Sequence, residues 1–280
     1  MADRGKEEVK LLPIAAGIAA VITMPGGSAL SGQDLPQWVL QLSKIKRQAK
    51  AELVRLPNFA CVETINRFQS QARSVVFKPI DTVKLEVAFV DGKELVAPAG
   101  GAVAFQEMDM RNLSRGGVIS TGAFAAVARN LFVNDNGRTT GWAEERILER
   151  PALRYDFVVS EMQAGYKLTS GGGEASVGIE GVFWADAETL ELLRIEQHAV
   201  DIPPFLGVQD TSTTVTYART RIGSSDVLLP RSAETVIINT DGWRGRNAIE
   251  FTGCREYVAD SVIRFDSVDP SPPGLPTKKK

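Results

Sequence analysis

The residues best suited to chemistry in this chain are two cysteines and one histidine. Cys61 and Cys254 are the only cysteines among the 280 residues, and His198 is the only histidine. A structural zinc site needs about four such ligands, which this set cannot supply. A serine–histidine–acid triad would have to use His198, and neither a G-x-S-x-G elbow nor a Walker A loop occurs. The sequence therefore predicts no catalytic residue, no metal site, no cofactor and a protein that is not an enzyme.

An apolar segment near the N-terminus indicates export. Residues 11–24 form an apolar run of 14 residues, interrupted by Pro13 and Gly17. A membrane-spanning helix needs about 20 apolar residues, whereas the core of a signal peptide needs about 7–15. Small residues follow, and cleavage after Ala29 would leave a small-x-small pattern. We predict a signal peptide over 1–29 and a periplasmic or exported protein; a retained N-terminal anchor is the alternative.

Export changes what the two cysteines predict. In an oxidising compartment, two cysteines favour a disulfide over a metal site. A bond between Cys61 and Cys254 would bracket nearly all of the strand patterns described below. Two buried free thiols in a cytosolic protein remain the alternative.

The first folded element is an amphipathic helix predicted over 34–56. Asp34 is a suitable N-cap, and Pro36 suits the first turn. Apolar residues recur at steps of three and four from Trp38, and basic residues occupy the other face. The basic set is Lys44, Lys46, Arg47 and Lys50. This face has two interpretations, a surface for anionic lipid or a solvated helix face, and the second is the more common.

Strand patterns dominate the rest of the chain. Residues 82–90 alternate apolar and polar side chains, and Asp91-Gly92 follows as a hairpin turn. A second, short helix is predicted over 122–131, with Thr121 as its cap. Further strands are predicted over 140–149, 152–160, 164–170, 175–185, 190–200, 211–221, 231–240, 245–254 and 256–266. Helices that come early and strands that follow in a meander indicate an α+β fold with one domain over 34–266. The Pro-rich residues 267–280 read as a disordered tail.

Apolar faces on these strands suggest a ligand cavity. In 175–185 apolar residues occupy both faces, with Phe183 on one side and Trp184 on the other. A curved sheet with helices in its hollow would form an apolar cleft, the usual kind of site for a lipid-like ligand. Ordinary core packing is the competing interpretation for each aromatic residue. The cavity candidates are Phe124, Trp142, Phe183, Trp184, Tyr217 and Phe251.

The stretch 183–194, read as Phe-Trp-Ala-Asp-Ala-Glu-Thr-Leu-Glu-Leu-Leu-Arg, resembles a hairpin of the lipoprotein-carrier and lipoprotein-sorting superfamily. Asp186 and Thr189 can hydrogen-bond the backbone of its turn. The resemblance implies a curved antiparallel half-barrel of about 10–11 strands, with an N-terminal helix and a short lid helix over a cavity for acyl chains. The sequences around Cys61 and Cys254 also look like those of exported bacterial proteins with this fold.

These observations lead to three hypotheses of function. The first is a non-enzymatic periplasmic protein that holds an acyl chain or another apolar ligand, with 122–131 as a movable lid. The second is an envelope protein-interaction or regulatory module with a dry core. The third, an envelope hydrolase, would depend on His198. The net charge of -2 gives no sign of nucleic-acid binding, and we expect a monomer.

Overall fold

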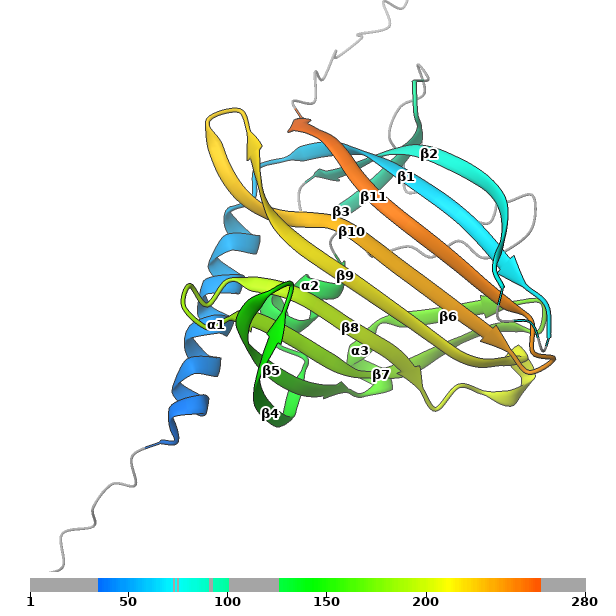
Figure 1. Ribbon diagram of the computed structural model, residues 1–280, viewed down its shortest axis with the longest axis horizontal. Coiled ribbons are helices and arrows are strands. Elements are labelled where there is room, and N and C mark those ends of the chain that lie inside the picture. Colours follow the sequence, from blue (N-terminus) through cyan, green and yellow to red (C-terminus); the bar gives the residue numbers. More distant parts are fainter. Residues whose placement is uncertain (1–34, 73, 75, 91–92, 101–125, 258–280) are drawn as a thin grey trace, which may run out of the picture. The chain divides into compact units, whose positions relative to one another are not determined.

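In the computed structural model, the described residues are 35–72, 74, 76–90, 93–100 and 126–257, and from Pro36 onward they belong to one compact unit. This unit is built on a single antiparallel sheet of 11 strands that does not close on itself (Figure 1). The strands are β1 Phe59–Ser70, β2 Lys78–Val90, β3 Lys93–Pro98, β4 Arg138–Ile147, β5 Arg150–Val159, β6 Tyr166–Ser170, β7 Gly173–Asp186, β8 Leu192–Val200, β9 Val208–Ile222, β10 Ser225–Asn239 and β11 Arg244–Glu256. The helical segments are α1 Gln37–Arg55, α2 Ala126–Ala128, η2 Arg129–Val133, α3 Glu161–Ala164 and η3 Pro204–Leu206.

The strand order shows how the sheet is assembled. Its sequence of neighbours is β3-β2-β1-β11-β10-β9-β8-β7-β5-β4, and β6 pairs with β7 beside this path. The predicted meander and strand number are confirmed, and an open half-barrel describes the sheet well. The label α+β fits only loosely, because few helical segments accompany the sheet among the described residues.

The strands differ in detail from their predictions. The strand β1 was not predicted, although it joins the first hairpin to the rest of the sheet. The predicted strand 245–254 forms as part of β11, whereas nearly all of the predicted strand 256–266 lies outside the described residues. The register between β7 and β8 shifts between Trp184 and Ala185. The residues that follow 257, including the predicted tail 267–280, lie outside the described part of the chain, as does the predicted signal peptide 1–29.

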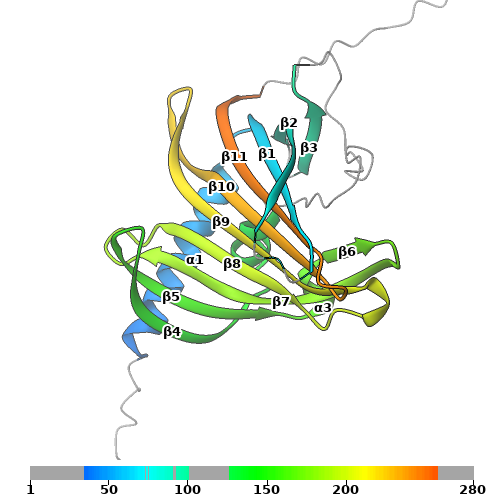
Figure 2. The same ribbon diagram turned by 45° about the vertical axis from the view of Figure 1, so that its right-hand side comes forward.

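Alternation along the strands separates the sheet into two faces. One face, called the inner face here, carries the main hydrophobic core, and the sheet bends around the helical segments on this side (Figure 2). The register aligns buried residues of seven strands into one row across it. This apolar row consists of Tyr155, Phe183, Ile195, Val215, Ala233, Ile249 and Ile65. Each is flanked in its strand by residues that point to the outer face, as the two-residue period of a strand requires.

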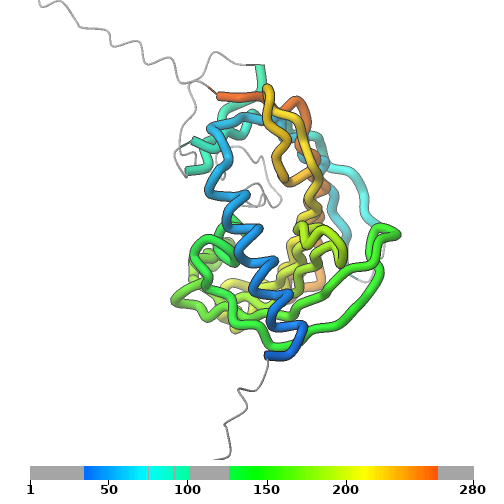
Figure 3. Tube along the Cα trace, turned by 90° about the vertical axis from the view of Figure 1, so that its left-hand side faces the viewer, coloured from blue at the N-terminus to red at the C-terminus, as the bar shows by residue number. Residues whose placement is uncertain are grey.

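Helix α1 packs on the inner face, and Figure 3 shows it running across the strands. Ile45 and Ala49 are buried in the main core, one turn apart. The Tyr155 hydroxyl donates a hydrogen bond to the carbonyl of Trp38 at 3.1 Å. The helix begins at Gln37, so Pro36 is the residue before the helix and not part of its first turn; no side chain caps it. Asp34 lies outside the described residues.

The second helical segment differs from its prediction. A single α-helical turn, α2, continues directly into the π-helical turn η2, which extends to Val133. Leu131 and Phe132 are buried on the inner face. The predicted start of this helix, including Thr121 and Phe124, lies outside the described residues. π-Helical turns are rare and occur often at functional sites.

A disulfide joins Cys61 of β1 to Cys254 of β11, as predicted, across a sequence separation of 193 residues. The two strands are paired directly, with Ala60 opposite Arg255 and Val62 opposite Thr252. The register shifts between these pairs, and Gly253 adopts φ of 57°, a conformation that glycine tolerates well. This irregularity places Cys254 beside Cys61. In the described part of the chain, none of the helices combines the length and apolar character needed to cross a membrane.

Replacing both cysteines should destabilise the fold strongly. The bond closes a very long loop, so the chain-entropy model assigns it about 4–5 kcal/mol. We expect the Cys61→Ser, Cys254→Ser double variant to lose this amount of unfolding free energy, measured by urea denaturation against the oxidised protein. Adding reductant should shift the midpoint of the wild type and leave that of the double variant unchanged. Equal midpoints for oxidised and reduced wild type would contradict the prediction.

Candidate functional site

An aromatic cluster occupies the centre of the inner face. Phe183 of β7 lies 5.3 Å from Tyr155 and 6.4 Å from Phe157, both of β5, measured between ring centroids. Phe132 of η2 meets the same ring edge-on at 5.2 Å. Such packing favours aromatic pairs beyond their buried area. Phe183 is therefore covered by a side chain from the α2–η2 segment.

Besides the burial of Leu131 and Phe132 in the core, the α2–η2 segment makes polar contacts with α1. Lys46 of α1 forms an ion pair with Asp135 at 2.7 Å, just after η2. Arg129 donates to the carbonyl of Leu53 at 3.2 Å, and its guanidinium lies 5.0 Å from the ring centroid of Phe89. The ion pair is partly exposed, so it contributes at most about 1 kcal/mol. The ion pair and the hydrogen bond link the segment to α1, and the guanidinium of Arg129 also contacts β2 of the sheet.

A second row, made of polar side chains, runs beside the apolar row on the inner face. Each member lies two residues along its strand from a member of the apolar row, a spacing of about 7 Å. The members are paired in register from β8 to β1, and each is at most 7% exposed. This polar row consists of Gln197, Thr213, Thr235, Asn247 and Arg67.

Some side chains of the polar row have hydrogen-bond partners, either within the row or in a neighbouring strand. The hydroxyls of Thr213 and Thr235 are 3.3 Å apart. Arg67 binds both carboxylate oxygens of Asp81 in the neighbouring strand, with one contact at 2.6 Å, and its hydrogen bond lowers the pKa of Asp81 against a smaller opposing effect of burial. The side-chain oxygen of Gln197 has no hydrogen-bond partner in the described structure. A buried polar atom without a hydrogen-bond partner raises the free energy of the folded state. The Gln197 oxygen can therefore accept a hydrogen bond from a ligand or a water molecule.

Glu63 is a further buried polar residue on this face. It lies in β1 opposite Phe251 on one side and Leu85 on the other, and it is 6% exposed. Burial, reinforced by the charge of Glu94, raises the pKa of its carboxyl to about 8. The side chain is therefore protonated at neutral pH, which makes it a possible hydrogen-bond donor.

The structure brings some of the predicted cavity residues together and separates others. Phe183, Tyr217 and Phe251 all belong to the main core on the inner face. Burial raises the pKa of the Tyr217 hydroxyl, which has no hydrogen-bond partner in the described structure. Trp142 is 42% exposed and stacks on Trp38 of α1, with ring centroids 6.2 Å apart.

One predicted cavity residue, Trp184, points away from the inner face, and another lies outside the described residues. Trp184 belongs to a small separate cluster with Ala152 and Leu193, away from the main core, and its indole donates to Glu145 at 2.9 Å. Its neighbour Phe183 faces the inner side, because adjacent strand residues point in opposite directions. Phe124 lies outside the described residues.

The polar row and Glu63 were not recognised in the sequence. The sequence contains a signal for part of the row: Asn247 is two residues before Ile249, and Thr213 is two residues before Val215, so each pair shares one face of its strand. Which strands are adjacent, and therefore that these polar residues align, is shown only by the register.

The single histidine lies on a strand face, as expected. His198 is paired with Glu180 across β7 and β8, with 3.2 Å between Nε2 and Oε1, and both side chains are about half exposed. Within the described ranges, no three histidine, cysteine or acidic side chains gather in a group able to hold a metal ion.

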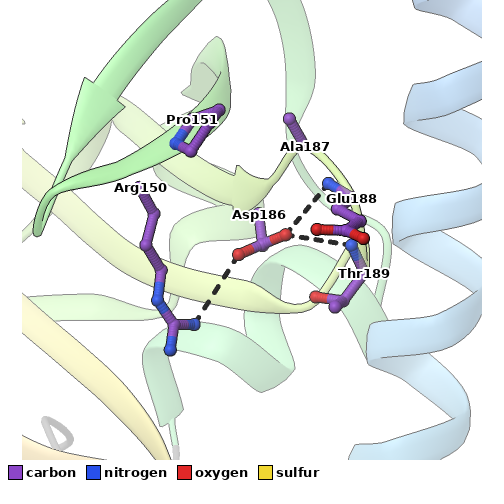
Figure 4. Close-up of a pocket in the computed structure, with 6 residues that line it drawn as sticks. All are labelled: Arg150, Pro151, Asp186, Ala187, Glu188 and Thr189. Carbon is purple, nitrogen blue, oxygen red and sulfur yellow. Dashed lines mark hydrogen bonds and ion pairs between the residues drawn. The ribbon is translucent and has the colours of Figure 1, made fainter.

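A pocket of about 480 Å³ lies at the β7–β8 hairpin, next to the start of β5 (Figure 4). Asp186 accepts hydrogen bonds from the backbone amides of Glu188 and Thr189, both at 2.9 Å, and lies 3.6 Å from Arg150. These contacts, the bond from Thr189 foremost, lower the pKa of the Asp186 carboxyl. The carbonyl of Thr189 accepts from Gln48 of α1 at 3.2 Å. The hairpin predicted from 183–194 thus forms and supports α1.

Comparisons with known proteins give only distant neighbours among solved structures. No protein-family model and no curated protein sequence matches this chain. Among solved structures, one neighbour is an outer membrane lipoprotein-sorting protein domain from Vibrio parahaemolyticus, with 12% identity, a TM-score of 0.43 and coverage of 77% of this chain and 92% of that chain. Another is MucB in complex with MucA(peri), with 11% identity, a TM-score of 0.21 and coverage of 79% and 98%. The first carries the description of the superfamily that the hairpin sequence resembles. At these TM-scores neither neighbour identifies a ligand or partner.

The shifted carboxyl of Glu63 makes stability depend on pH. The folded state keeps this proton up to about pH 8, whereas the unfolded carboxyl ionises near 4.5. The stabilisation is therefore fully present below pH 4.5 and is lost as the pH rises through 8. We expect the unfolding free energy to fall by about 2 kcal/mol between pH 6 and pH 8, and this slope to flatten in Glu63→Gln.

The control for this measurement is Glu250→Gln in β11, an exposed glutamate that should keep the wild-type slope. Urea titrations at several pH values give the result. A Glu63→Gln variant with the wild-type slope would show that Glu63 does not hold the proton.

Proposed function

We propose that this protein is a non-enzymatic binding protein of the cell envelope, whose inner face holds an amphiphile with an acyl chain and an uncharged polar head. The observation that carries the proposal is the parallel course of the apolar row and the polar row on the same face of the sheet. One row suits a hydrocarbon chain, and the other suits the hydroxyl, ester or amide groups attached to it.

The apolar row supports the part of the proposal that concerns the chain. It spans seven strands and is covered by α1 and the α2–η2 segment, as a lidded cleft requires. In the form described, Phe132 occupies the place next to Phe183. Ligand entry would displace the α2–η2 segment, whose polar tethers to α1 are few.

The polar row supports the part that concerns the head group. Buried polar residues are disfavoured in a core that only has to be stable, because each must find a partner. Five such residues in register, with the Gln197 oxygen unpartnered, make a surface that hydrogen-bonds a ligand along a line. Arg67 is bound to Asp81, so the row presents little net charge. An uncharged polar head is therefore the better fit.

The disulfide supports a place in the envelope, because such bonds form and persist in oxidising compartments. The apolar segment 11–24 is in keeping with export to the periplasm.

Loosening the lid should speed ligand entry. Asp135→Asn removes the ion pair with Lys46 and keeps a residue that tolerates the φ of 54° found at this position. We expect a fluorescent monoacylglycerol, whose head is uncharged, to associate up to about five-fold faster, since an exposed pair contributes at most about 1 kcal/mol. Stopped-flow fluorescence measures the rate, with Met162→Ala on α3, 95% exposed, as the control. An unchanged rate would contradict the lid, and a wild type that binds no probe would contradict the proposed function.

Removing the hydroxyls of the polar row should weaken binding of ligands with a polar head. The Thr213→Val, Thr235→Val variant keeps the shape of both side chains. We expect it to bind a monoacylglycerol about ten-fold more weakly, because each net hydrogen bond contributes about 0.5–1.5 kcal/mol. Binding of the methyl ester of the same acyl chain should change much less.

Isothermal titration calorimetry of both ligands tests this difference. The matched control is Thr214→Val, the neighbouring threonine of β9, which is not part of the buried row. Equal losses for the two ligands, or an equal loss in the control, would show that the row does not contact the head group.

A further inference from the structure

The exposed face of α1 carries four cations and no acid. At 100° per residue, its fully exposed side chains fall within an arc of roughly 140° opposite Ile45 and Ala49. The basic members of this face are Lys44, Arg47, Lys50 and Arg55. They extend over about 17 Å of helix, from the second turn to the last. We call this set the basic face of α1.

None of these four cations forms an ion pair with a described residue. Arg47 and Arg55 donate only to carbonyls of their own helix, at 3.3 Å and 3.0 Å. Lys46, which the sequence grouped with them, points away and pairs with Asp135. Glu52, the one acid in the helix, lies outside the arc and pairs with Arg219. The charge of the basic face is therefore not neutralised within the described protein.

The outer face of the sheet offers a contrast. Its arginines are mostly paired with acids of the same or adjacent strands, for example Arg154 with Asp156 at 2.7 Å and Arg246 with Glu234 at 2.7 Å. Unlike those arginines, the four cations of the basic face lie on one side of a single helix and form no ion pair with a described residue. This arrangement favours an extended anionic partner over an isolated counter-charge.

Apolar side chains lie within and beside the basic face. Leu40 and Val54, in the same arc, are 42% and 60% exposed. At the N-terminal end of the helix, Leu35 is 60% exposed, and Trp142 stacks on Trp38 with 42% of its surface accessible. Cations with exposed leucine and valine on the same side of the helix, and an aromatic pair at one end, match the interfacial region of a bilayer.

We propose that the basic face of α1 docks on an anionic lipid surface, with its cations at the lipid phosphates and Leu40 and Val54 at the boundary of the acyl region. A bilayer can receive both kinds of side chain along a straight helix, because it presents phosphate and hydrocarbon in adjacent layers. An acidic protein would meet the cations but would need separate pockets for Leu40 and Val54. Docking of this kind does not depend on a ligand in the inner face.

The test is flotation of the full chain with vesicles of phosphatidylcholine alone and of phosphatidylcholine with about 30% phosphatidylglycerol. We expect the wild type to prefer the anionic vesicles, and the preference to fall as salt rises from about 50 to 500 mM. The variant Lys44→Glu, Arg47→Glu, Lys50→Glu should lose at least about ten-fold in partitioning to anionic vesicles. Far-UV circular dichroism shows whether α1 is retained.

A matched control carries the same change in charge elsewhere. Lys78→Glu, Lys84→Glu and Arg231→Glu reverse three exposed cations on β2 and β10 and should leave partitioning within about two-fold of the wild type. Because the apolar segment 11–24 is present in every protein compared, differences report on the substituted residues. Equal losses in both triple variants, no preference of the wild type for anionic vesicles, or retained binding by a folded α1 variant would each overturn the proposal. Capture of the basic face by an acidic protein with no binding to vesicles would overturn it as well.

Discussion

The pairing of β1 with β11 is the contact on which the rest of this structure depends. Strands β4 to β11 form one continuous group, and the β1–β3 group joins it through this single strand pair and the disulfide beside it. Both rows of the inner face cross the junction, since Ile65 lies opposite Ile249 and Arg67 opposite Asn247. A shift of the β1–β11 register by one residue would bring Thr64 and Asn66 to the inner face. It would also move Ile65 and Arg67, which are the members of the apolar and polar rows on β1, to the outer face. The disulfide lies at one end of the pair and fixes this register.

Apolar and polar side chains of the inner face have opposite effects on the stability of the core. Its apolar row and aromatic cluster favour a closed, dry core, whereas the polar row and Glu63 raise the free energy of that core unless their atoms find partners. A raised pKa at Glu63 and an unpartnered oxygen at Gln197 are the physical consequences. A face that served stability alone would carry apolar residues at these positions, so the polar row is the strongest indication that the face binds something.

Helix α1 connects the two surfaces for which we propose roles. Its buried side, with Ile45 and Ala49, covers the inner face, and its exposed side carries four unpaired cations. The helix is also linked to Asp135, next to the α2–η2 segment, through Lys46 and to the β7–β8 hairpin through Gln48. A displacement of α1 would therefore disturb contacts with the α2–η2 segment and with the hairpin together. These contacts offer a physical route by which binding on one side of the helix would affect the inner face on the other.

The sequence by itself determined the local features. Alternation of side chains identified most strands, β2 and β3 pair as the hairpin prediction requires, and the hairpin around Asp186 and Thr189 forms as its residues suggest. The cysteine pair was predicted from composition and export. These features depend on neighbours along the chain, which a sequence displays directly. The missed strand β1 contains charged residues at buried positions, so its alternation was obscured.

Only the tertiary structure decided which residues meet. Period-two alternation assigns a side chain to one of two faces, but it does not say which strands are adjacent or in what register. Gln197, Thr213, Thr235, Asn247 and Arg67 become one row because five strands align, and the partners Arg67 and Asn247 are separated by most of the folded chain. Tertiary packing also buried Glu63 and placed Phe132 of η2 against Phe183 of β7. Long-range pairing is set by the free energy of the whole sheet, which no short segment encodes.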